Sequence, residues 1–177
     1  MFTIESRGIF HRKKRLVAPT KLAEADFHEV ASRVGSRPFK ARKIGFVAAR
    51  KTETEQAIVT KWDGTESNNT ARPGDWIVTN LSSNRQVLRD KNGNTNTYVV
   101  RADMFADLYE SVQGSNDLGQ FYKAKGVVDA VYLSGGFDIL APWGQKQTAG
   151  AGYLLLNDGE VYGNNAITFD ATYEKMH

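Results

Sequence analysis

The chain has 177 residues, of which 41% are hydrophobic and 24% are charged, a size and composition typical of one globular domain or two very small ones. The absence of cysteine excludes disulfides, zinc–thiolate sites and cysteine nucleophiles. The sequence contains neither a run of about 18 apolar residues nor an apolar N-terminal segment, so we expect no membrane span and no secretory signal.

The net charge of +3 conceals a basic N-terminal part and an acidic remainder. Residues 1–51 contain 13 Lys or Arg and 4 Asp or Glu, whereas residues 52–177 contain 10 and 16. A basic segment can bind nucleic acid or another acidic partner, or it can pack against the acidic part of its own chain. The opposite charge within the same chain favours the second interpretation.

The N-terminal segment, residues 1–38, is basic and is expected to contain one helix. Its densest charge run is "HRKKR" at residues 11–15. Gly35 can end the helix, and Pro38 follows it. The apolar side chains before Gly35 recur at helical spacing and would share one face: Phe27, Val30, Ala31 and Val34.

Residues 39–110 and 121–174 resemble each other, and residues 111–120 have the Gly, Ser, Asn and Asp typical of an exposed linker. Matches that keep their order along the chain predict an internal duplication. The endings "YVVRADMFADLYE" and "YGNNAITFDATYE" align without a gap and share these identical pairs: Tyr98/Tyr162, Ala102/Ala166, Phe105/Phe169, Tyr109/Tyr173 and Glu110/Glu174.

Each repeat is expected to consist mostly of strands. Short segments rich in β-branched and aromatic residues are bounded by turn residues, as in "KIGFVAA", "DWIVTNL", "VVDAVYL" and "GYLLLN". We expect a short helical turn with Phe105 and Tyr109 on one face, and a hairpin tip at Asn92-Gly93. The predicted fold is therefore α+β and mainly β, with two tandem small β-rich repeat domains preceded by an N-terminal helix.

The segment "PGDWIVTN" at 73–80 aligns with "GAGYLLLN" at 150–157, and the second copy lacks the carboxylate. Pro73, Gly74 and Asp75 suit a tight turn, because Pro presets φ, Gly accepts a positive φ and Asp bonds the turn backbone. Glycine alone would make the equivalent corner in the second copy. We therefore interpret Asp75 as a turn residue, with a functional carboxylate as the alternative.

The second repeat resembles the small PGDYG family, named for a Pro-Gly-Asp-Tyr-Gly motif, through "FYKAKGVVDA", "PWGQKQTAGAGYLLLN" and "GEVYGNNAITFDATYE". The first repeat is similar to it through "WDG", "PGDWIV" and "YVVRADMFADLYE". Where the family has its naming motif, the second repeat has "DGEVYG". The resemblance implies a phage or bacterial source and a doubled small domain, and it supplies no catalytic residues.

The residue inventory gives little support to an enzyme. Asp63, Asp75 and Glu110 could bind a divalent cation, but solvated strand ends are the preferred interpretation. We therefore expect no catalytic residues, no metal site and no cofactor. The histidines have neither metal-ligand spacing nor the motif of a catalytic triad; they are His11, His28 and His177.

Two sets of residues are candidates for binding. The first could line a site for a nucleotide-like or other flat ligand, although large aromatic side chains in small domains more often fill the core; it comprises Trp62, Asp63, Asp75, Trp76, Trp143 and Tyr153. The second could follow a phosphate backbone, with a solvated flank as the alternative; it comprises Arg12, Lys13, Lys14, Arg15, Arg42 and Lys43.

The sequence best fits a non-enzymatic binding or interaction protein of phage or bacterial origin, whose target is a protein partner, an assembly subunit or a nucleotide-like ligand. A nucleic-acid-binding protein that uses the basic N-terminal third is the alternative, and an enzyme with a carboxylate-bound metal is third. We expect a protein partner or self-assembly, no membrane, and a location in the cytoplasm of a bacterial host or on a virion.

Overall fold

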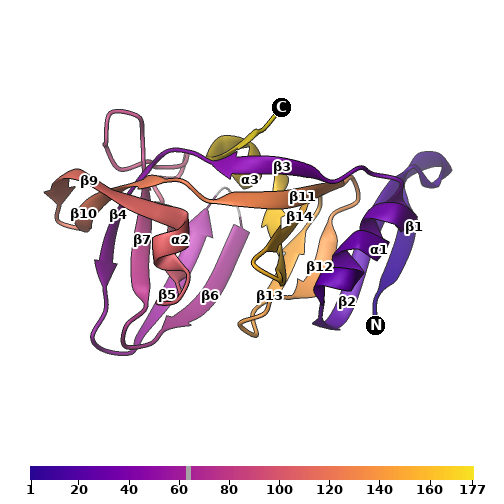
Figure 1. Cartoon of the computed structure of the whole chain (residues 1–177), viewed down its shortest axis with the longest axis horizontal. Coiled ribbons are helices and arrows are strands. Elements are labelled where there is room, and N and C mark those ends of the chain that lie inside the picture. The colour runs from indigo at the N-terminus through magenta and orange to yellow at the C-terminus, as the bar shows by residue number, and fades with distance from the viewer. Residues whose placement is uncertain (63–64) are drawn as a thin grey trace. The chain divides into compact units, whose positions relative to one another are not determined.

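The computed structural model describes residues 1–62 and 65–177 and divides into two compact units (Figure 1). Unit 1 comprises residues 1–42 and 127–177, and unit 2 comprises residues 43–126. Strands predominate in both units and helices are few and short, which confirms the predicted α+β, mainly β fold class.

Unit 1 contains two sheets with helices beside them. In chain order its elements are β1 (Thr3–Arg7), the 3-10 helix η1 (Ile9–His11), β2 (Lys13–Lys21), α1 (Glu24–Val34), β3 (Phe39–Lys43), β11 (Val127–Leu133), β12 (Phe137–Leu140), β13 (Lys146–Ala149), β14 (Gly152–Asn157), β15 (Glu160–Asn165), α3 (Ala166–Thr172) and β16 (Tyr173–Lys175). One sheet has the order β1-β2-β12-β13 and the other the order β15-β14-β11-β3-β16.

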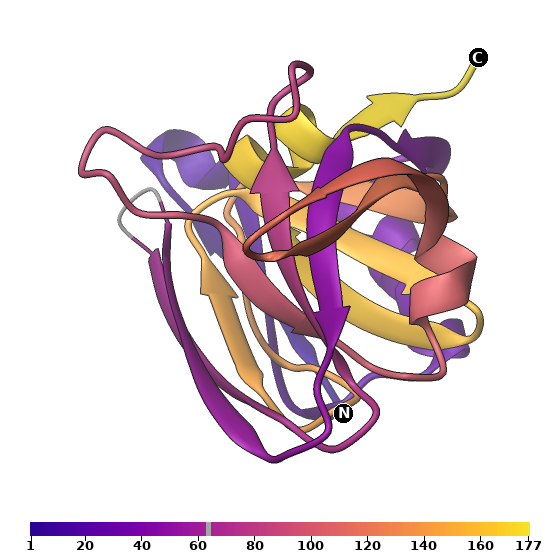
Figure 2. The same cartoon turned by 90° about the vertical axis from the view of Figure 1, so that its left-hand side faces the viewer.

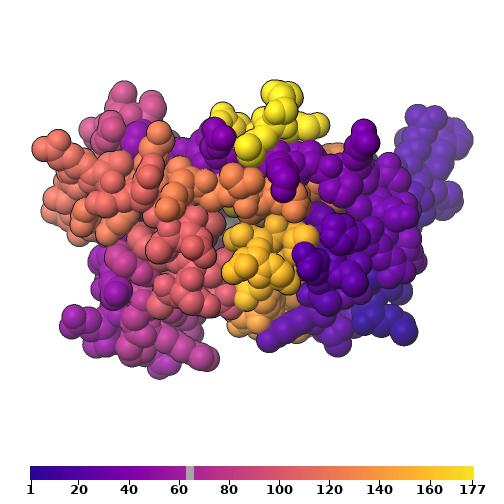
Figure 3. All heavy atoms as spheres, in the orientation of Figure 1, coloured from indigo at the N-terminus to yellow at the C-terminus, as the bar shows by residue number. Residues whose placement is uncertain are grey.

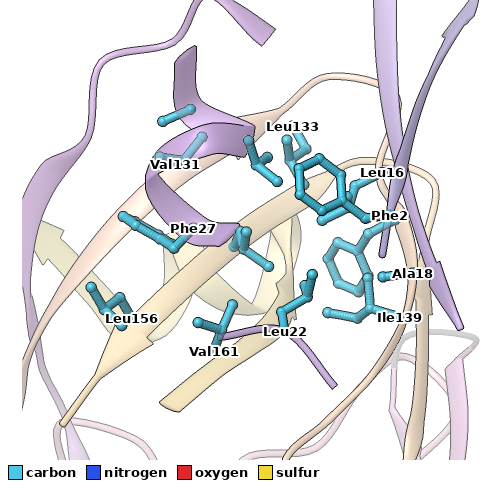
Figure 4. Packing of buried hydrophobic residues seen from close by; sticks show 14 of the residues in the cluster. Phe2, Leu16, Ala18, Leu22, Phe27, Val131, Leu133, Ile139, Leu156 and Val161 are labelled. Carbon is cyan, nitrogen blue, oxygen red and sulfur yellow. The ribbon is translucent and has the colours of Figure 1, made fainter. Parts of the chain in front are cut away.

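Helix α1 contributes its apolar face to the core of unit 1 (Figure 4). Phe27 and Val30 are fully buried, in one cluster with Leu154 and Val161 of the sheet. Burial of each such side chain stabilises the fold by about 1.5–3 kcal/mol. Gly35 ends the helix with a φ of 72°, a left-handed conformation that glycine adopts at low cost. The predicted helix is therefore confirmed.

Two glycines of unit 1 make room for the ring of Phe137, which is only 2% exposed. A Cβ atom on Gly163 would lie 2.5 Å from this ring, and a Cβ atom on Gly152 would lie 2.6 Å from it. Both distances are far shorter than a carbon–carbon contact of about 3.5–4.0 Å. Strands β14 and β15 therefore need glycine where they face Phe137.

The basic N-terminal segment forms a strand pair in addition to the predicted helix. Strand β2 pairs antiparallel with β1 and parallel with β12. Leu16 and Ala18 of β2 are buried at alternate positions, so the strand has one face in the core. Residues 127–177, which share unit 1, contain 2 Lys or Arg and 6 Asp or Glu. The basic start and the acidic end of the chain thus fold together in one unit.

Unit 2 contains one five-stranded sheet and a separate two-stranded hairpin (Figure 2). Its elements are β4 (Phe46–Lys51), β5 (Gln56–Trp62), β6 (Thr65–Ala71), β7 (Trp76–Leu81), β8 (Thr97–Val100), α2 (Phe105–Leu108), β9 (Tyr109–Asn116) and β10 (Gly119–Ala124). The order is β8-β7-β4-β10-β9 in the sheet, and β5 pairs with β6. The expected hairpin tip at Asn92-Gly93 is a small turn in which Gly93 has a φ of 82°. Arg89 and Thr95 on either side of it form an isolated antiparallel β-bridge.

The five-stranded sheets of the two units share most of their connectivity. In each, a central strand (β4 or β11) pairs with β7 or β14, which pairs with β8 or β15, and a short helix then leads into the edge strand β9 or β16. The strand between the central strand and the edge strand comes from the other predicted repeat. In unit 1 it is β3, which starts the first predicted repeat, and in unit 2 it is β10, which starts the second. The compact units therefore differ from the predicted domains 39–110 and 121–174.

Candidate functional site

Trp76 stacks on the short helix in the core of unit 2. Its ring centroid lies 3.9 Å from that of Phe105, which in turn stacks on Tyr109 at 5.1 Å. Tyr122 meets Trp76 edge-on at 5.7 Å, and the Nζ atom of Lys51 lies 5.5 Å from the Trp76 ring centroid. Trp76 is half-buried, so it packs as a core residue with a lysine on its outer side.

Tyr153 occupies a similar stack in unit 1. Its ring centroid lies 3.9 Å from that of Phe169, which stacks on Tyr173 at 4.8 Å. The Tyr153 hydroxyl donates a hydrogen bond of 3.2 Å to a carboxylate oxygen of Asp170. Burial and the negative charge of Asp170 raise the pKa of Tyr153 to about 12, so this phenol stays protonated at physiological pH.

Trp143 has packing partners of its own. The Trp143 indole donates a hydrogen bond of 2.9 Å to the Gln145 side chain, and its ring centroid lies 5.5 Å from that of Tyr162. Trp62 is the half-buried last residue of β5, and Asp63 lies outside the described residues. The described members of the predicted ligand set are thus divided between the two units.

Asp75 holds two segments of unit 2 together through both carboxylate oxygens. One oxygen accepts a hydrogen bond of 3.0 Å from the Arg72 N–H, and the other accepts one of 3.1 Å from the Ala102 N–H. In unit 1 the N–H of Ala166 donates instead to the backbone carbonyl of Ala151, at 3.1 Å. In the aligned segment a backbone oxygen therefore takes the role that one oxygen of Asp75 has toward Ala102.

Within the described residues, neither a surface hollow nor a cluster of carboxylates reproduces a predicted site. One hollow of about 470 Å³ is lined by Val59, Lys61, Glu66, Asn94 and Thr95, and none of these belongs to the predicted ligand set. Over residues 1–62 and 65–177, no three His, Asp or Glu side chains gather as a potential metal site. No helix in the described part of the chain is long and apolar enough to cross a membrane.

Two of the six basic candidates, Arg15 and Arg42, contact other residues of unit 1. An Nη atom of Arg15 donates hydrogen bonds to the carbonyls of Gly135, at 3.1 Å, and Ala149, at 2.8 Å, so its guanidinium ties β2 to a neighbouring turn. Arg42 lies 3.9 Å from Glu174 with both side chains about half exposed, a geometry that contributes little to stability.

Lys43 is held against two tyrosines of unit 2. Its Nζ atom lies 6.0 Å from the Tyr98 ring centroid and 5.7 Å from that of Tyr109. Burial of the amine lowers the pKa of Lys43 from 10.5 to about 8. The Tyr98 hydroxyl donates to the Asn80 side chain at 3.0 Å and lies 2.6 Å from the Tyr109 hydroxyl, and burial raises the pKa of Tyr98 to about 12. Lys43 is therefore a partly buried residue whose amine packs against two aromatic rings of this cluster.

The remaining basic candidates surround the end of the β1–β2 hairpin, residues 8–12, which we call the tip. Figure 3 shows the tip in indigo, standing out from the rest of unit 1 at the upper right. Ile9 is 80% exposed and Phe10 is 81% exposed. The Arg12 guanidinium lies 5.6 Å from the centroid of the Phe10 ring. Two large apolar side chains are thus presented to solvent beside a cation.

The tip region stores unfavourable free energy in its backbone and its charges. Phe10 and His11 have φ values of 59° and 55°, and a left-handed conformation costs a residue with a Cβ atom about 1–2 kcal/mol. Arg7 is the direct cross-strand neighbour of Lys13, and like charges in such a pair repel each other. Glu5 offsets part of this repulsion through its 2.7 Å ion pair with Arg7. Strain of this kind gathers at functional sites.

Comparisons with known proteins give no match. No family model matches the chain, and neither the curated proteins nor the solved structures contain a significant match. The resemblance to the PGDYG family therefore stays an expectation from the sequence, and the candidate site rests on the geometry of the tip.

Sequence reasoning singled out the basic run but missed the two apolar residues before it. The signal was present, because "RGIFHRKKR" places Ile9 and Phe10 between a glycine and a series of cations. Gly8 can start a turn, and an apolar pair inside a charged turn has no core to enter. The strand pairing of β1 with β2 was needed to show that both side chains are exposed.

Proposed function

We propose that this chain is a non-enzymatic binding protein that holds an anionic partner at the tip of the β1–β2 hairpin. The observation that carries the proposal is the exposure of Ile9 and Phe10, 80% and 81%, among basic side chains. Residues 5–15 carry five Lys or Arg and a single carboxylate, Glu5. A partner that covers this surface would bury apolar area and receive complementary charge in one contact.

The energetics of the tip favour such a contact. Burying an exposed side chain the size of Ile or Phe gains about 1.5–3 kcal/mol. An anion placed between Arg7 and Lys13, which face each other across the hairpin, would turn their repulsion into attraction. The left-handed backbone of Phe10 and His11 is already formed, so binding costs little further ordering of the tip.

The setting of this function follows from the sequence resemblance and is part of the same proposal. A phage or bacterial protein of this kind would act in the cytoplasm of a bacterial host or on a virion. Its partner would be another molecule of the host or the assembly, with the tip as the point of contact.

Retention on immobilised heparin, a sulfated polyanion, tests the proposal. The variant Arg7→Ala/Lys13→Ala loses two cations next to the tip, and Lys40→Ala/Arg42→Ala loses two exposed cations elsewhere in unit 1. Both variants lower the net charge from +3 to +1. We expect the tip variant to elute at clearly lower salt than the wild type and the control variant to elute close to it. Equal losses in the two variants would show that only the net charge matters and would refute the proposal.

A further inference from the structure

We infer that the anionic partner is single-stranded nucleic acid, with the ring of Phe10 stacking on a base and the cations of the hairpin binding the adjacent phosphates. The inference rests on the proposed function of the tip and names the chemistry of its partner. It is carried by the juxtaposition of an exposed aromatic ring with cations on both strands of the β1–β2 hairpin.

The ring of Phe10 has the properties of a stacking platform. It is 81% exposed, and its backbone conformation holds it at the end of the hairpin. The Arg12 guanidinium, 5.6 Å from the ring centroid, is a second planar group beside it. Bases stack on both aromatic rings and guanidinium planes, and this stacking is nearly independent of base identity.

The cations are distributed as a phosphate backbone requires. Arg7 and Lys13 are cross-strand neighbours and therefore share one face of the ribbon, next to the tip. Lys14 lies on the opposite face, where its Nζ atom donates a hydrogen bond of 2.8 Å to the Ser6 hydroxyl. A strand whose base stacks on Phe10 can thus place phosphates beside Arg7 and Lys13 on one face.

Two other anionic surfaces are less well matched by the tip. A membrane surface requires a larger apolar area than two side chains, because even a complete acyl chain gives only marginal binding. A duplex presents charge but keeps its bases stacked on each other, so Phe10 could reach a base face only after the costly separation of a base step. Single strands offer both features without that cost.

The test is a fluorescence anisotropy titration of labelled (dT)20 with the full chain at low salt. Phe10→Leu keeps an apolar side chain at the tip but removes the ring, Phe10→Trp keeps a ring, and Tyr132→Leu removes an aromatic ring that is 43% exposed elsewhere in unit 1. We expect Phe10→Leu to weaken binding roughly 5- to 150-fold. Phe10→Trp and Tyr132→Leu should bind like the wild type. Removing Lys13 should lower the slope of log affinity against log salt by about 0.7.

The outcomes separate this inference from the proposed function. Equal affinity of wild type and Phe10→Leu for (dT)20 overturns the inference, and so does tighter binding to a 20-base-pair duplex or to phosphatidylserine vesicles than to (dT)20. If heparin retention depends on Arg7 and Lys13 but (dT)20 does not bind, the proposed function stands and the nucleic-acid inference fails. If heparin retention does not depend on these two cations, the proposed function itself fails.

Discussion

Substitution of Asp75 measures how much of unit 2 depends on one carboxylate. Its two oxygens accept separate hydrogen bonds from the N–H groups of Arg72 and Ala102, at 3.0 and 3.1 Å. An asparagine has one carbonyl oxygen and can accept from only one of these groups in the same position. A hydrogen bond to a charged group contributes about 1.5–3 kcal/mol when buried, and at this partly exposed turn we expect about 1 kcal/mol for each.

The expected order of stability is therefore wild type, Asp75→Asn and Asp75→Ala, with losses of about 1 and 2 kcal/mol. Urea denaturation followed by tryptophan fluorescence measures these losses as shifts of the midpoint at constant slope. Asp103→Asn is the control, because Asp103 is 75% exposed and pairs only loosely, at 3.4 Å, with Arg101. An Asp75→Ala variant as stable as the wild type would refute the structural role and point to a functional carboxylate.

Two further predictions concern the core of unit 1 and the pH dependence of unit 2. Gly163→Ala should destabilise unit 1 by about 1–3 kcal/mol, because the new Cβ atom would overlap the ring of Phe137. Gly150→Ala should be neutral, because no atom lies within 4 Å of its new Cβ atom. Thermal unfolding of both variants checks this. Because the pKa of Lys43 is lowered to about 8 in the folded chain, the unfolded chain binds more protons than the folded chain above about pH 8. The stability of unit 2 should therefore rise from about pH 8 to about pH 10. Lys43→Met should abolish this rise, as measured by urea denaturation at each pH. Above about pH 10 stability should fall, because the pKa of Tyr98 is raised to about 12 in the folded state and its phenol ionises more readily in the unfolded chain.

The elements with a strong local signal were predictable from sequence. Phe27 and Val30 at helical spacing before Gly35 specify α1, and the structure confirms it. The expected short helical turn is present as α2, which ends at Leu108, and Tyr109 at the start of β9 stacks on Phe105. Local spacing and turn chemistry are sufficient in these cases, because the residues that determine the element are also its neighbours.

Strand partners and buried charges were not predictable in the same way. Nothing local in β3 or β10 shows which sheet each strand joins, because pairing is decided by contacts between distant parts of the chain. Arg15 and Lys43 were interpreted as surface cations, since such side chains are mostly exposed. The structure instead gives Arg15 two backbone carbonyl partners and packs the amine of the partly buried Lys43 against the rings of Tyr98 and Tyr109.

The central claim is that the tip is the contact surface of this protein, and backbone amide NMR tests it most directly. A defined heparin oligosaccharide, which has charge but no bases, is titrated into the ¹⁵N-labelled chain. The largest chemical-shift changes are predicted between Arg7 and Lys14, around the exposed side chains of Ile9 and Phe10. Changes centred instead on another basic segment, such as Arg89 to Lys91 of unit 2, would contradict the claim.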